Sequence, residues 1–261
     1  MCRLLGLIAN KPVDLAFSLK KFEKFASRNP DGWGIGWYSQ RQANVFKEGI
    51  PANNSPNYPQ MSKQVRSHII ISHVRLGTGA EPARRNSHPF IYKNWMFAHN
   101  GCVNRYHLES LLYEEYLSRI EGETDSELYF YWLLQNITEK GDMIKGIKSA
   151  VDEIINNGSY SGLNFILSDG TRVYAFRYSE SSSEYYSLYA LQRVSSKNVP
   201  FESYSKETRA LLRSKSLNGE QAVLVSSEPL TIDEEWEPIK MGNLLVVEDD
   251  LSMKQIEIVR W

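Results

Sequence analysis

The chain begins Met1-Cys2-Arg3-Leu4-Leu5-Gly6. The interpretation of the rest of the sequence depends on the role of Cys2 in this stretch. Cysteine is small, so methionine aminopeptidase can remove Met1 and leave Cys2 with a free α-amino group. A thiol and an amine of near-neutral pKa then share one residue, and the amine can act as the base for the thiol. The alternative is a cysteine that merely begins a buried strand over residues 2–8, since cysteine packs as a small hydrophobe. On this stretch alone the buried strand is the preferred interpretation.

The overall composition predicts a soluble, cytoplasmic protein. The chain has 261 residues and a net charge of −1, with charges of both signs mixed along it, so neither a nucleic-acid nor a membrane partner is indicated. The two cysteines, Cys2 and Cys102, imply no disulfide framework and fit a reducing compartment. The N-terminus lacks the features of a signal peptide, and no apolar run approaches the ~20 residues of a membrane span.

Apolar periodicity predicts strands, then helices, then strands. The first strands are expected at residues 3–9, 42–46, 68–74 and 95–98. The helices are expected at residues 13–25, 107–121, 128–135 and 143–155. The later strands are expected at residues 163–167, 173–177, 186–191, 222–226 and 244–248. With no break in composition, this order predicts one domain over residues 1–261 with a layered α+β architecture.

Two segments between these elements are distinctive. Gly34 and Gly36 alternate with large apolar residues, which predicts a strand that another backbone approaches closely. Residues 49–62 are rich in proline and asparagine, which predicts a long loop that is functional or mobile.

The segment Arg75-Leu76-Gly77-Thr78-Gly79 follows a predicted buried strand. It offers a guanidinium, a hydroxyl and free backbone N–H groups together, which are the parts of a carboxylate-binding site. The alternative is an exposed arginine in a surface turn.

The segment His99-Asn100-Gly101 also ends a short predicted strand. Asparagine followed by glycine is usually a turn, but the side-chain amide of Asn100 and the N–H of Gly101 could also form an oxyanion hole. The adjacent Cys102 is interpreted as core packing. Asp125 lies within a capping-box pattern, so it could be simply a first-turn acid on the helix dipole.

Each of these signals is weak alone, but together they match the recognition of an amino acid and attack on its side-chain carbonyl. Arg75 would pair with an α-carboxylate and Asp125 with an α-ammonium. Asn100 and Gly101 would hold the oxyanion that forms when Cys2 attacks. A γ-amide satisfies that geometry, and its hydrolysis releases ammonia.

The chain resembles the class II glutamine amidotransferases over nearly its whole length. The matching motifs, in the order and spacing of the family, are Cys2, Arg28-Asn29-Pro30-Asp31-Gly32-Trp33-Gly34, Ser72-His73-Val74-Arg75-Leu76-Gly77-Thr78, Asn86-Ser87-His88-Pro89, His99-Asn100-Gly101 and Thr124-Asp125-Ser126-Glu127. Shorter matches follow at Leu163-Asn164-Phe165, Ser168-Asp169-Gly170 and Ser226-Ser227-Glu228-Pro229-Leu230.

The resemblance implies a four-layer αββα sandwich of the N-terminal-nucleophile hydrolase type. It implies roles for the site residues: Cys2 as nucleophile, Asn100 and Gly101 as oxyanion hole, and Arg75, Thr78 and Asp125 as glutamine ligands. Arg28 and Asp31 would be supporting residues that order the terminus, and His88 and His99 structural, hydrogen-bonded histidines near the site. Neither a cofactor nor a metal is expected.

Two departures from the amino-sugar-forming members of the family bear on the substrate. Leu76 stands where those members carry a tryptophan that closes over the site, and the chain ends at Trp261 without a synthase domain. The sequence is closer to the stand-alone branch, which includes a γ-glutamyl hydrolase of ergothioneine synthesis and a subunit of a glutathione-degrading complex. We therefore expect substituted γ-glutamyl amides to be better substrates than glutamine, with the loop at residues 49–62 bordering an open pocket.

Three functions remain open at this point. The first is hydrolysis of glutamine or another γ-glutamyl amide, a small-molecule substrate. The second is a subunit that donates ammonia to a separate synthase, or that assembles with a hydrolase subunit. The third is a non-catalytic binding protein, which retention of Met1 would favour because a blocked amine cannot serve as base.

Overall fold

Two antiparallel sheets form the centre of the molecule. The computed structural model describes residues 2–14, 16–181, 184–193, 205–206 and 220–260. The first sheet has seven strands in the order β11-β9-β10-β1-β4-β2-β3, and the second has six in the order β13-β12-β8-β7-β6-β5. The first contains β1 (Arg3–Val13), β2 (Trp33–Ser39), β3 (Gln42–Glu48), β4 (Ser67–Val74), β9 (Tyr189–Arg193), β10 (Ala222–Ser226) and β11 (Glu237–Pro238). The second contains β5 (Phe90–Tyr92), β6 (Trp95–Asn100), β7 (Asn164–Ser168), β8 (Val173–Phe176), β12 (Asn243–Val247) and β13 (Met253–Glu257).

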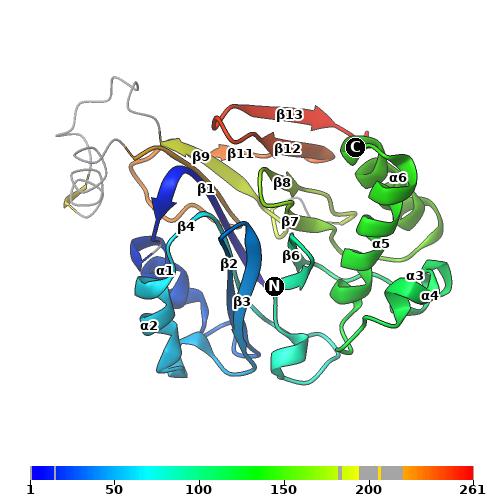
Figure 1. Cartoon of the computed structure of the whole chain (residues 1–261), viewed down its shortest axis with the longest axis horizontal. Helices are drawn as coiled ribbons and strands as arrows, with labels where there is room; N and C mark the ends of the chain where they lie inside the picture. Colours follow the sequence, from blue (N-terminus) through cyan, green and yellow to red (C-terminus); the bar gives the residue numbers. More distant parts are fainter. Residues whose placement is uncertain (1, 15, 182–183, 194–204, 207–219, 261) are drawn as a thin grey trace.

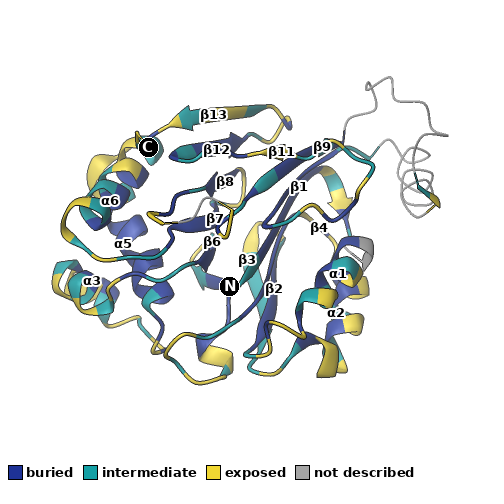
Figure 2. Cartoon of the chain, turned by 180° about the vertical axis from the view of Figure 1, so that it is seen from behind, coloured by how far each residue is buried: buried dark blue, intermediate teal, exposed yellow. Residues whose placement is uncertain are grey.

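Helices cover the outer face of each sheet (Figure 1). The first sheet is covered by α1 (Ala16–Phe22), α2 (Asn57–Gln64) and the short 3-10 helices η1 (Glu23–Phe25) and η2 (Ala52–Asn54). The second is covered by α5 (Asp125–Lys140) and α6 (Met143–Asn157), with α3 (Arg105–Leu111) and α4 (Glu114–Leu117) beside them. The central strands are buried, whereas the edge strand β13 and the outer sides of the helices are exposed (Figure 2). The prediction of a four-layer αββα sandwich is confirmed.

The alternation of side chains along β1 builds two of the three apolar layers. Leu5 and Leu7 pack toward α1 and α2, whereas Leu4 and Ile8 pack between the two sheets. Successive side chains of a strand point to opposite faces, so a strand covered on both faces has to be apolar throughout. A third apolar cluster fills the space between the second sheet and α5 and α6.

The middle position of β1 fixes the start of the chain. Strand β1 pairs with β10 on one side and with β4 on the other, with Arg3 opposite Val74. The N–H of Leu4 also donates to the Oγ atom of Ser227 at 2.9 Å. Cys2 therefore lies beside the residues that directly follow β4.

Most predicted elements are present, but the segment at residues 49–62 is not the long loop expected. It contains η2 and most of α2, whose Tyr58 is buried against the outer face of the first sheet and donates its hydroxyl to the carbonyl of Leu19 at 3.0 Å. Pro59 is tolerated there because it lies in the first turn of α2, where an N–H would have no partner within the helix.

The helix expected at residues 107–121 is two helices, α3 and α4. The side chain of Gln135 accepts a hydrogen bond from the N–H of Tyr113 at 2.9 Å and donates to the carbonyl of Leu111 at 3.1 Å. This contact from α5 satisfies backbone groups where the helix breaks. Strands β5, β11 and β13 were not anticipated.

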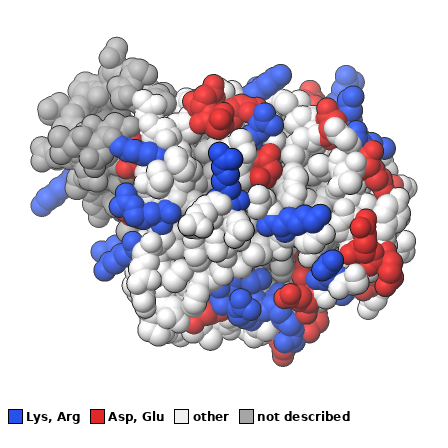
Figure 3. Space-filling model, viewed as in Figure 1, with Lys and Arg blue, Asp and Glu red and all other residues white. Residues whose placement is uncertain are grey.

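The surface carries charges of both signs, as the sequence predicts. Basic and acidic side chains occur across the face shown in Figure 3. Among the helices of the described ranges, none combines the length and the apolar character that a membrane span requires.

Candidate active site

One cavity of about 330 Å³ gathers most of the predicted site residues. It lies where β1 begins, where β4 and β6 end, and where α5 starts. Seven of the predicted residues line it: Cys2, Arg75, Thr78, His88, His99, Gly101 and Asp125. Asn100, Asp31 and Arg28 are not part of its lining.

A larger cavity, of about 800 Å³, lies at the other end of β1. It is lined by the far ends of β1 and β4 and by turns of both sheets, such as Gln40 and Arg41 in the β2–β3 turn and Gly170 in the β7–β8 turn. No predicted site residue and no cysteine is part of its described lining. The smaller cavity is therefore the candidate active site.

The thiol of Cys2 is held by the backbone of Leu76. The N–H of Leu76 lies 3.2 Å from Sγ, and the thiol can donate to the carbonyl of the same residue at 3.4 Å. Burial raises the pKa of Cys2, while the Leu76 N–H and the charge of Arg75 act in the opposite direction. A thiol in this environment needs a local base to become a nucleophile. Met1, on which the free amine depends, lies outside the described residues.

Asn100 ends β6 and is buried, and its side-chain nitrogen Nδ2 has no hydrogen-bond partner among the described residues. A buried donor left without an acceptor is costly, which marks it as a candidate ligand-binding group. Gly101 follows with φ of 153°, and a Cβ atom there would lie 1.8 Å from the carbonyl oxygen of Gly162. Only glycine fits this position, and it lines the cavity directly after the unpartnered amide.

Arg75 is 3% exposed, so the interpretation as an exposed surface arginine is wrong. Its Nη1 atom donates to the carbonyls of Asp31 and Glu81, each at 3.2 Å, and its Nη2 atom to that of Ala80 at 2.7 Å. Three of the five guanidinium N–H groups therefore hold the backbone around the cavity. The two that remain, the Nε–H among them, are enough for a carboxylate.

Thr78 and Cys102 meet across the cavity, with Oγ1 and Sγ 3.2 Å apart. The interpretation of Cys102 as core packing is wrong, because the residue is half-buried and lines the cavity. Its neighbour Val103 forms a β-bridge with Tyr160 and points into the core beneath α5. Adjacent side chains in extended backbone point in opposite directions, so Cys102 faces the cavity.

Asp125 has both the helix-start position and the cavity-facing position that the sequence left open. It begins α5, and Thr124 caps that helix by accepting from the N–H of Glu127 at 3.3 Å. Its Oδ2 atom accepts from the N–H of Val103 at 2.7 Å, and its Oδ1 atom from that of Ser126 at 2.9 Å. Each carboxylate oxygen can accept a further bond, so the group can still bind a cation from the cavity.

His99 is hydrogen-bonded at both ring nitrogens. Nε2 lies 3.1 Å from the carbonyl oxygen of Gly162, and Nδ1 lies 2.9 Å from Oγ of Ser126. A carbonyl only accepts, so Nε2 carries the proton and Nδ1 accepts from the serine hydroxyl. Burial lowers the pKa of His99, against the raising effect of Asp125, which favours this neutral form.

His88 differs, because neither of its ring nitrogens has a hydrogen-bond partner in the described part of the chain. Its ring packs 4.2 Å from that of His73 and 4.7 Å from that of Phe90. Burial lowers the pKa of His73 to about 3 and that of His88 well below its usual range. His73 was not predicted to be near the site. The only feature of the sequence that could have indicated this is the motif that it shares with Arg75 and Thr78.

The two remaining predicted residues are placed differently. Asp31 lies behind the cavity, where its Oδ2 atom accepts from the N–H of Gly77 at 2.7 Å and its own N–H donates to the carbonyl of Arg75 at 3.1 Å. It thus positions the segment that follows β4. Arg28 is exposed, and the structure does not bring it to the cavity.

Two charged residues of the cavity were missed. Arg105 donates to the carbonyl of Thr124 at 3.3 Å and lies 3.4 Å from Glu109, and Glu123 lies just before the start of α5. Both fall between predicted elements, Arg105 before the helix expected at residues 107–121 and Glu123 after it. Within the described ranges, no group of three or more histidine, cysteine, aspartate or glutamate residues could hold a metal ion.

Comparisons with known proteins identify the family and agree with the fold. A family model described as class II glutamine amidotransferases matches residues 1–258. The protein named "Putative glutamine amidotransferase YafJ" of Escherichia coli (strain K12) is 32% identical over 93% of this chain and 95% of its own length. The gamma-glutamyl-hercynylcysteine sulfoxide hydrolase of Mycobacterium tuberculosis (strain CDC 1551 / Oshkosh) is 28% identical over 40% of this chain and 51% of its own.

A solved structure of similar fold is the glutamine aminotransferase class-II domain protein from Silicibacter pomeroyi. It has a TM-score of 0.67 at 22% identity, covering 99% of this chain and 100% of that one. The likeness at this identity concerns the fold.

Proposed function

The chain belongs to the class II glutamine amidotransferases, a family of enzymes, and from this premise we propose that it hydrolyses the γ-amide of glutamine or of a γ-glutamyl compound. The observation that carries the proposal is the cavity lining, in which the thiol of Cys2 shares one small space with Arg75, Thr78 and Asp125. A nucleophile beside one cation and one anion is suited to a zwitterionic amino acid whose side chain reaches the thiol.

The proposed reaction begins with removal of Met1, which exposes the α-amine of Cys2. The amine takes the proton of the thiol, and the sulfur attacks the γ-carbonyl carbon. The carbonyl oxygen becomes an oxyanion that accepts hydrogen bonds from Nδ2 of Asn100 and the N–H of Gly101. The protonated amine then gives its proton to the leaving nitrogen, the C–N bond breaks, and ammonia or an amine departs.

The remaining steps return the enzyme to its first state. The γ-glutamyl group is now held on Cys2 as a thioester. Water attacks the thioester carbon with the α-amine again as base, the same oxyanion hole stabilises the intermediate, and glutamate leaves with the sulfur restored as a thiol. The balance is one amide bond and one water consumed for one carboxylate and one amine.

Recognition of the glutamyl half is assigned to three side chains. The N–H groups of Arg75 that do not bind backbone carbonyls hold the α-carboxylate, and the hydroxyl of Thr78 assists. The carboxylate of Asp125, which faces the cavity, holds the α-ammonium. None of these groups reads the substituent on the γ-nitrogen, so they serve glutamine and substituted γ-glutamyl amides equally.

The finer proposal is that substituted γ-glutamyl amides are better substrates than glutamine. Leu76 lines the cavity beside Cys2, where a leucine closes over the site less than a tryptophan does. The similarity to a γ-glutamyl hydrolase of Mycobacterium tuberculosis supports the same substrate class. Binding energy from the part beyond the γ-nitrogen then raises kcat/KM. The segment at residues 49–62 has no part in this, because none of it lines the cavity.

The test compares glutamate release from glutamine and from γ-glutamyl-cysteine-type compounds. It uses protein whose loss of Met1 has been verified by intact mass, with Met1-retaining protein as the control. Faster release from the substituted amides supports the finer proposal. Preference for glutamine, or activity only after a synthase is added, favours the ammonia-donating subunit. Binding of these compounds without any glutamate release from processed protein would overturn hydrolysis.

A further inference from the structure

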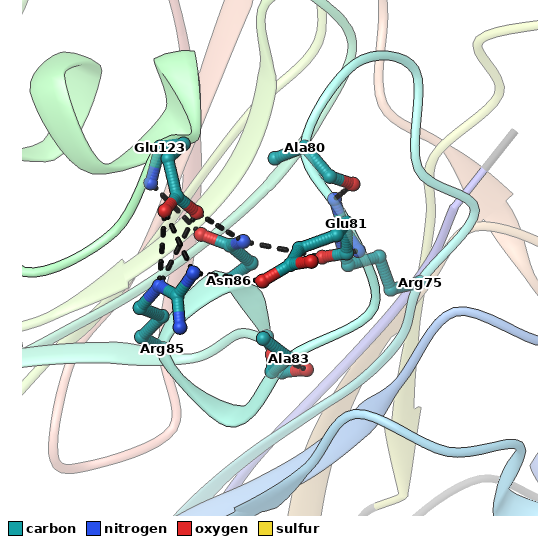
Figure 4. Close-up of polar contacts among 8 residues, drawn as sticks. Arg75, Ala80, Glu81, Ala83, Arg85, Asn86 and Glu123 are labelled. Atoms are coloured by element: carbon teal, nitrogen blue, oxygen red, sulfur yellow. Dashed lines mark hydrogen bonds and ion pairs between the residues drawn. The ribbon is translucent and has the colours of Figure 1, made fainter.

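The buried side chain of Asn86 joins the two loops that contribute Ala80 and Glu123 to the lining of the cavity. Asn86 ends the 3-10 helix η3 (Arg84–Asn86) and is 0% exposed. Its Nδ2 atom donates to Oε2 of Glu123 at 2.6 Å and to the carbonyl of Glu81 at 3.1 Å, and its Oδ1 atom accepts from the N–H of Glu123 at 2.9 Å. Figure 4 shows Asn86 between the two glutamates, with Arg75 on the far side of Glu81.

The groups that Asn86 contacts lead directly to the proposed substrate ligands. The carbonyl of Glu81 is shared, because it also accepts from Nη1 of Arg75 at 3.2 Å. Glu123 lies two residues before Asp125 in the chain and lines the same cavity. A continuous set of hydrogen bonds therefore runs from the cation to the segment that carries the anion.

We propose that Asn86 is a positioning residue that sets the separation between the carboxylate-binding and ammonium-binding groups. The inference rests on the proposed function, since it takes Arg75 and Asp125 as the ligands of the glutamyl α-carbon end. Within the described part of the chain, the side-chain amide of Asn86 bonds to Glu81 and Glu123 and to neither the thiol nor the oxyanion hole, so it acts through its two neighbouring loops.

The exposed charges around Asn86 contribute less to this arrangement. Arg85 forms ion pairs with Glu123 and Glu81, but these three side chains are 44%, 54% and 67% exposed. Exposed ion pairs are weak because water and salt screen them. The buried amide is different, since it bonds a backbone N–H and a backbone carbonyl that have to be satisfied inside the protein. We call the buried amide of Asn86, with its hydrogen bonds to Glu81 and Glu123, the clasp. Variants that remove the exposed ion pairs serve as controls for variants that remove the clasp.

Loss of the clasp should affect substrate binding more than the chemical step. Cys2 precedes β1, and Asn100 and Gly101 lie at the end of β6, so the reacting groups are held by the two sheets. The ligands of the α-carbon end are attached to the loops that Asn86 joins: Arg75 bonds the carbonyl of Glu81, and Asp125 begins α5 two residues after Glu123. A change in loop separation therefore weakens uniform binding and raises KM, while kcat changes little.

The experiment measures kcat and KM for a γ-glutamyl amide with processed protein. Asn86→Ala removes all three side-chain hydrogen bonds and should raise KM about tenfold, with kcat within about twofold. Glu123→Ala removes one of the bonds and should raise KM by a smaller factor. Arg85→Ala and Glu81→Ala remove only exposed ion pairs, since the clasp uses the backbone of Glu81, and both should match the parent.

A paired exchange keeps the test informative if Asn86→Ala fails to fold. Asn86→Asp places a carboxylate against Glu123 and should raise KM strongly. Adding Glu123→Gln restores a side-chain hydrogen bond with donor and acceptor exchanged, and KM should fall back toward the parent value. A merely structural role predicts changes in melting temperature without a selective change in KM.

The outcomes separate this inference from the proposed function. If the parent hydrolyses γ-glutamyl amides but Asn86→Ala lowers kcat at unchanged KM, or if Arg85→Ala raises KM as much, the clasp is wrong and the hydrolase stands. If the processed parent hydrolyses none of these compounds, the proposed function fails. The clasp is then overturned with it, because it is a statement about that substrate.

Discussion

The backbone N–H of Leu76 lies 3.2 Å from the Sγ atom of Cys2, although 74 residues separate them in the sequence. This contact exists because β1 and β4 are neighbours in register, with Arg3 opposite Val74, so the residue before one strand meets the residues after the other. The proposed nucleophile and the proposed carboxylate ligand Arg75 are thus placed by one strand pairing.

The identity of the nucleophile can be tested with an amide-mimicking electrophile. Cys2→Ala should abolish glutamate release with the fold intact, and Cys2→Ser should retain little, since a hydroxyl ionises far less than a thiol. Diazo-oxo-norleucine should label one residue, identified by peptide mass mapping. The structure makes this a demanding test, because Cys102 lines the same cavity. Labelling of Cys102 in place of Cys2 would refute the assignment.

The oxyanion-hole role of Asn100 predicts a defect in the chemical step. Asn100→Ala removes the buried nitrogen that lacks a partner within the described residues, and should lower kcat by ~10²–10³. Steady-state kinetics at saturating substrate measure the effect. Asn100→Asp, which keeps the size but loses the donor, is the control for shape. A change confined to KM is the result that contradicts this role.

Arg75 should affect binding. Arg75→Lys keeps the charge but loses the planar set of donors, three of which hold loop carbonyls. We expect a higher KM, a smaller change in kcat and a lower melting temperature, measured by kinetics and thermal unfolding. Unchanged KM would remove Arg75 from the list of substrate ligands.

Asp125 should discriminate substrates by their α-ammonium group. Asp125→Asn should weaken binding of γ-glutamyl amides with a free α-ammonium and leave N-acylated analogues, already poor substrates, little changed. The ratio of kcat/KM between the two classes is the measurement. An equal loss on both would mean that the carboxylate acts only through its hydrogen bonds to Val103 and Ser126.

The buried His73 predicts a loss of stability in acid. Its folded pKa of about 3 lies below the usual value of 6.5, so the unfolded chain binds this proton more tightly at every pH between the two. The contribution of His73 to the free energy of unfolding is therefore complete above pH 6.5, the pKa in the unfolded chain. It is lost as the pH falls toward about 3, the pKa in the folded protein. His73→Phe should reduce the slope of unfolding free energy against pH by up to ~1.4 kcal/mol per pH unit around pH 4 to 6. Chemical denaturation at several pH values measures it, and an unchanged slope would contradict the assignment.

The sequence predicted the strands well because their alternation records burial on two faces. Gly34 and Gly36 also indicated close contact, and a Cβ atom at Gly34 would indeed lie 2.2 Å from the carbonyl oxygen of His88. Elements set by distant side chains were not predictable. The break between α3 and α4 depends on Gln135 of another helix, and the two-residue β11 carries no periodicity.

The site could be predicted as a set of motifs but not as an arrangement. Cys102 was wrongly predicted to pack in the core, because the direction of its side chain depends on the pairing of Val103 with Tyr160, a residue distant in the sequence. Asn86 belongs to a motif that was recognised in the sequence. Its proposed role could not be predicted, because it depends on the tertiary contacts of its side chain with Glu81 and Glu123. The local sequence pattern indicates which residues are candidates for a chemical role, and tertiary contacts determine where their side chains point.

The middle position of β1 in its sheet has a consequence for how the proposed nucleophile should become exposed. Amide protons of a strand paired on both sides are expected to exchange with solvent only when the whole molecule opens. Because the proposed nucleophile is the residue before this strand, fluctuations of surface loops do not release it. Exposure of the Cys2 thiol to alkylating reagents on heating should therefore follow the same curve as global unfolding, whereas loss of substrate binding through the loops can precede it.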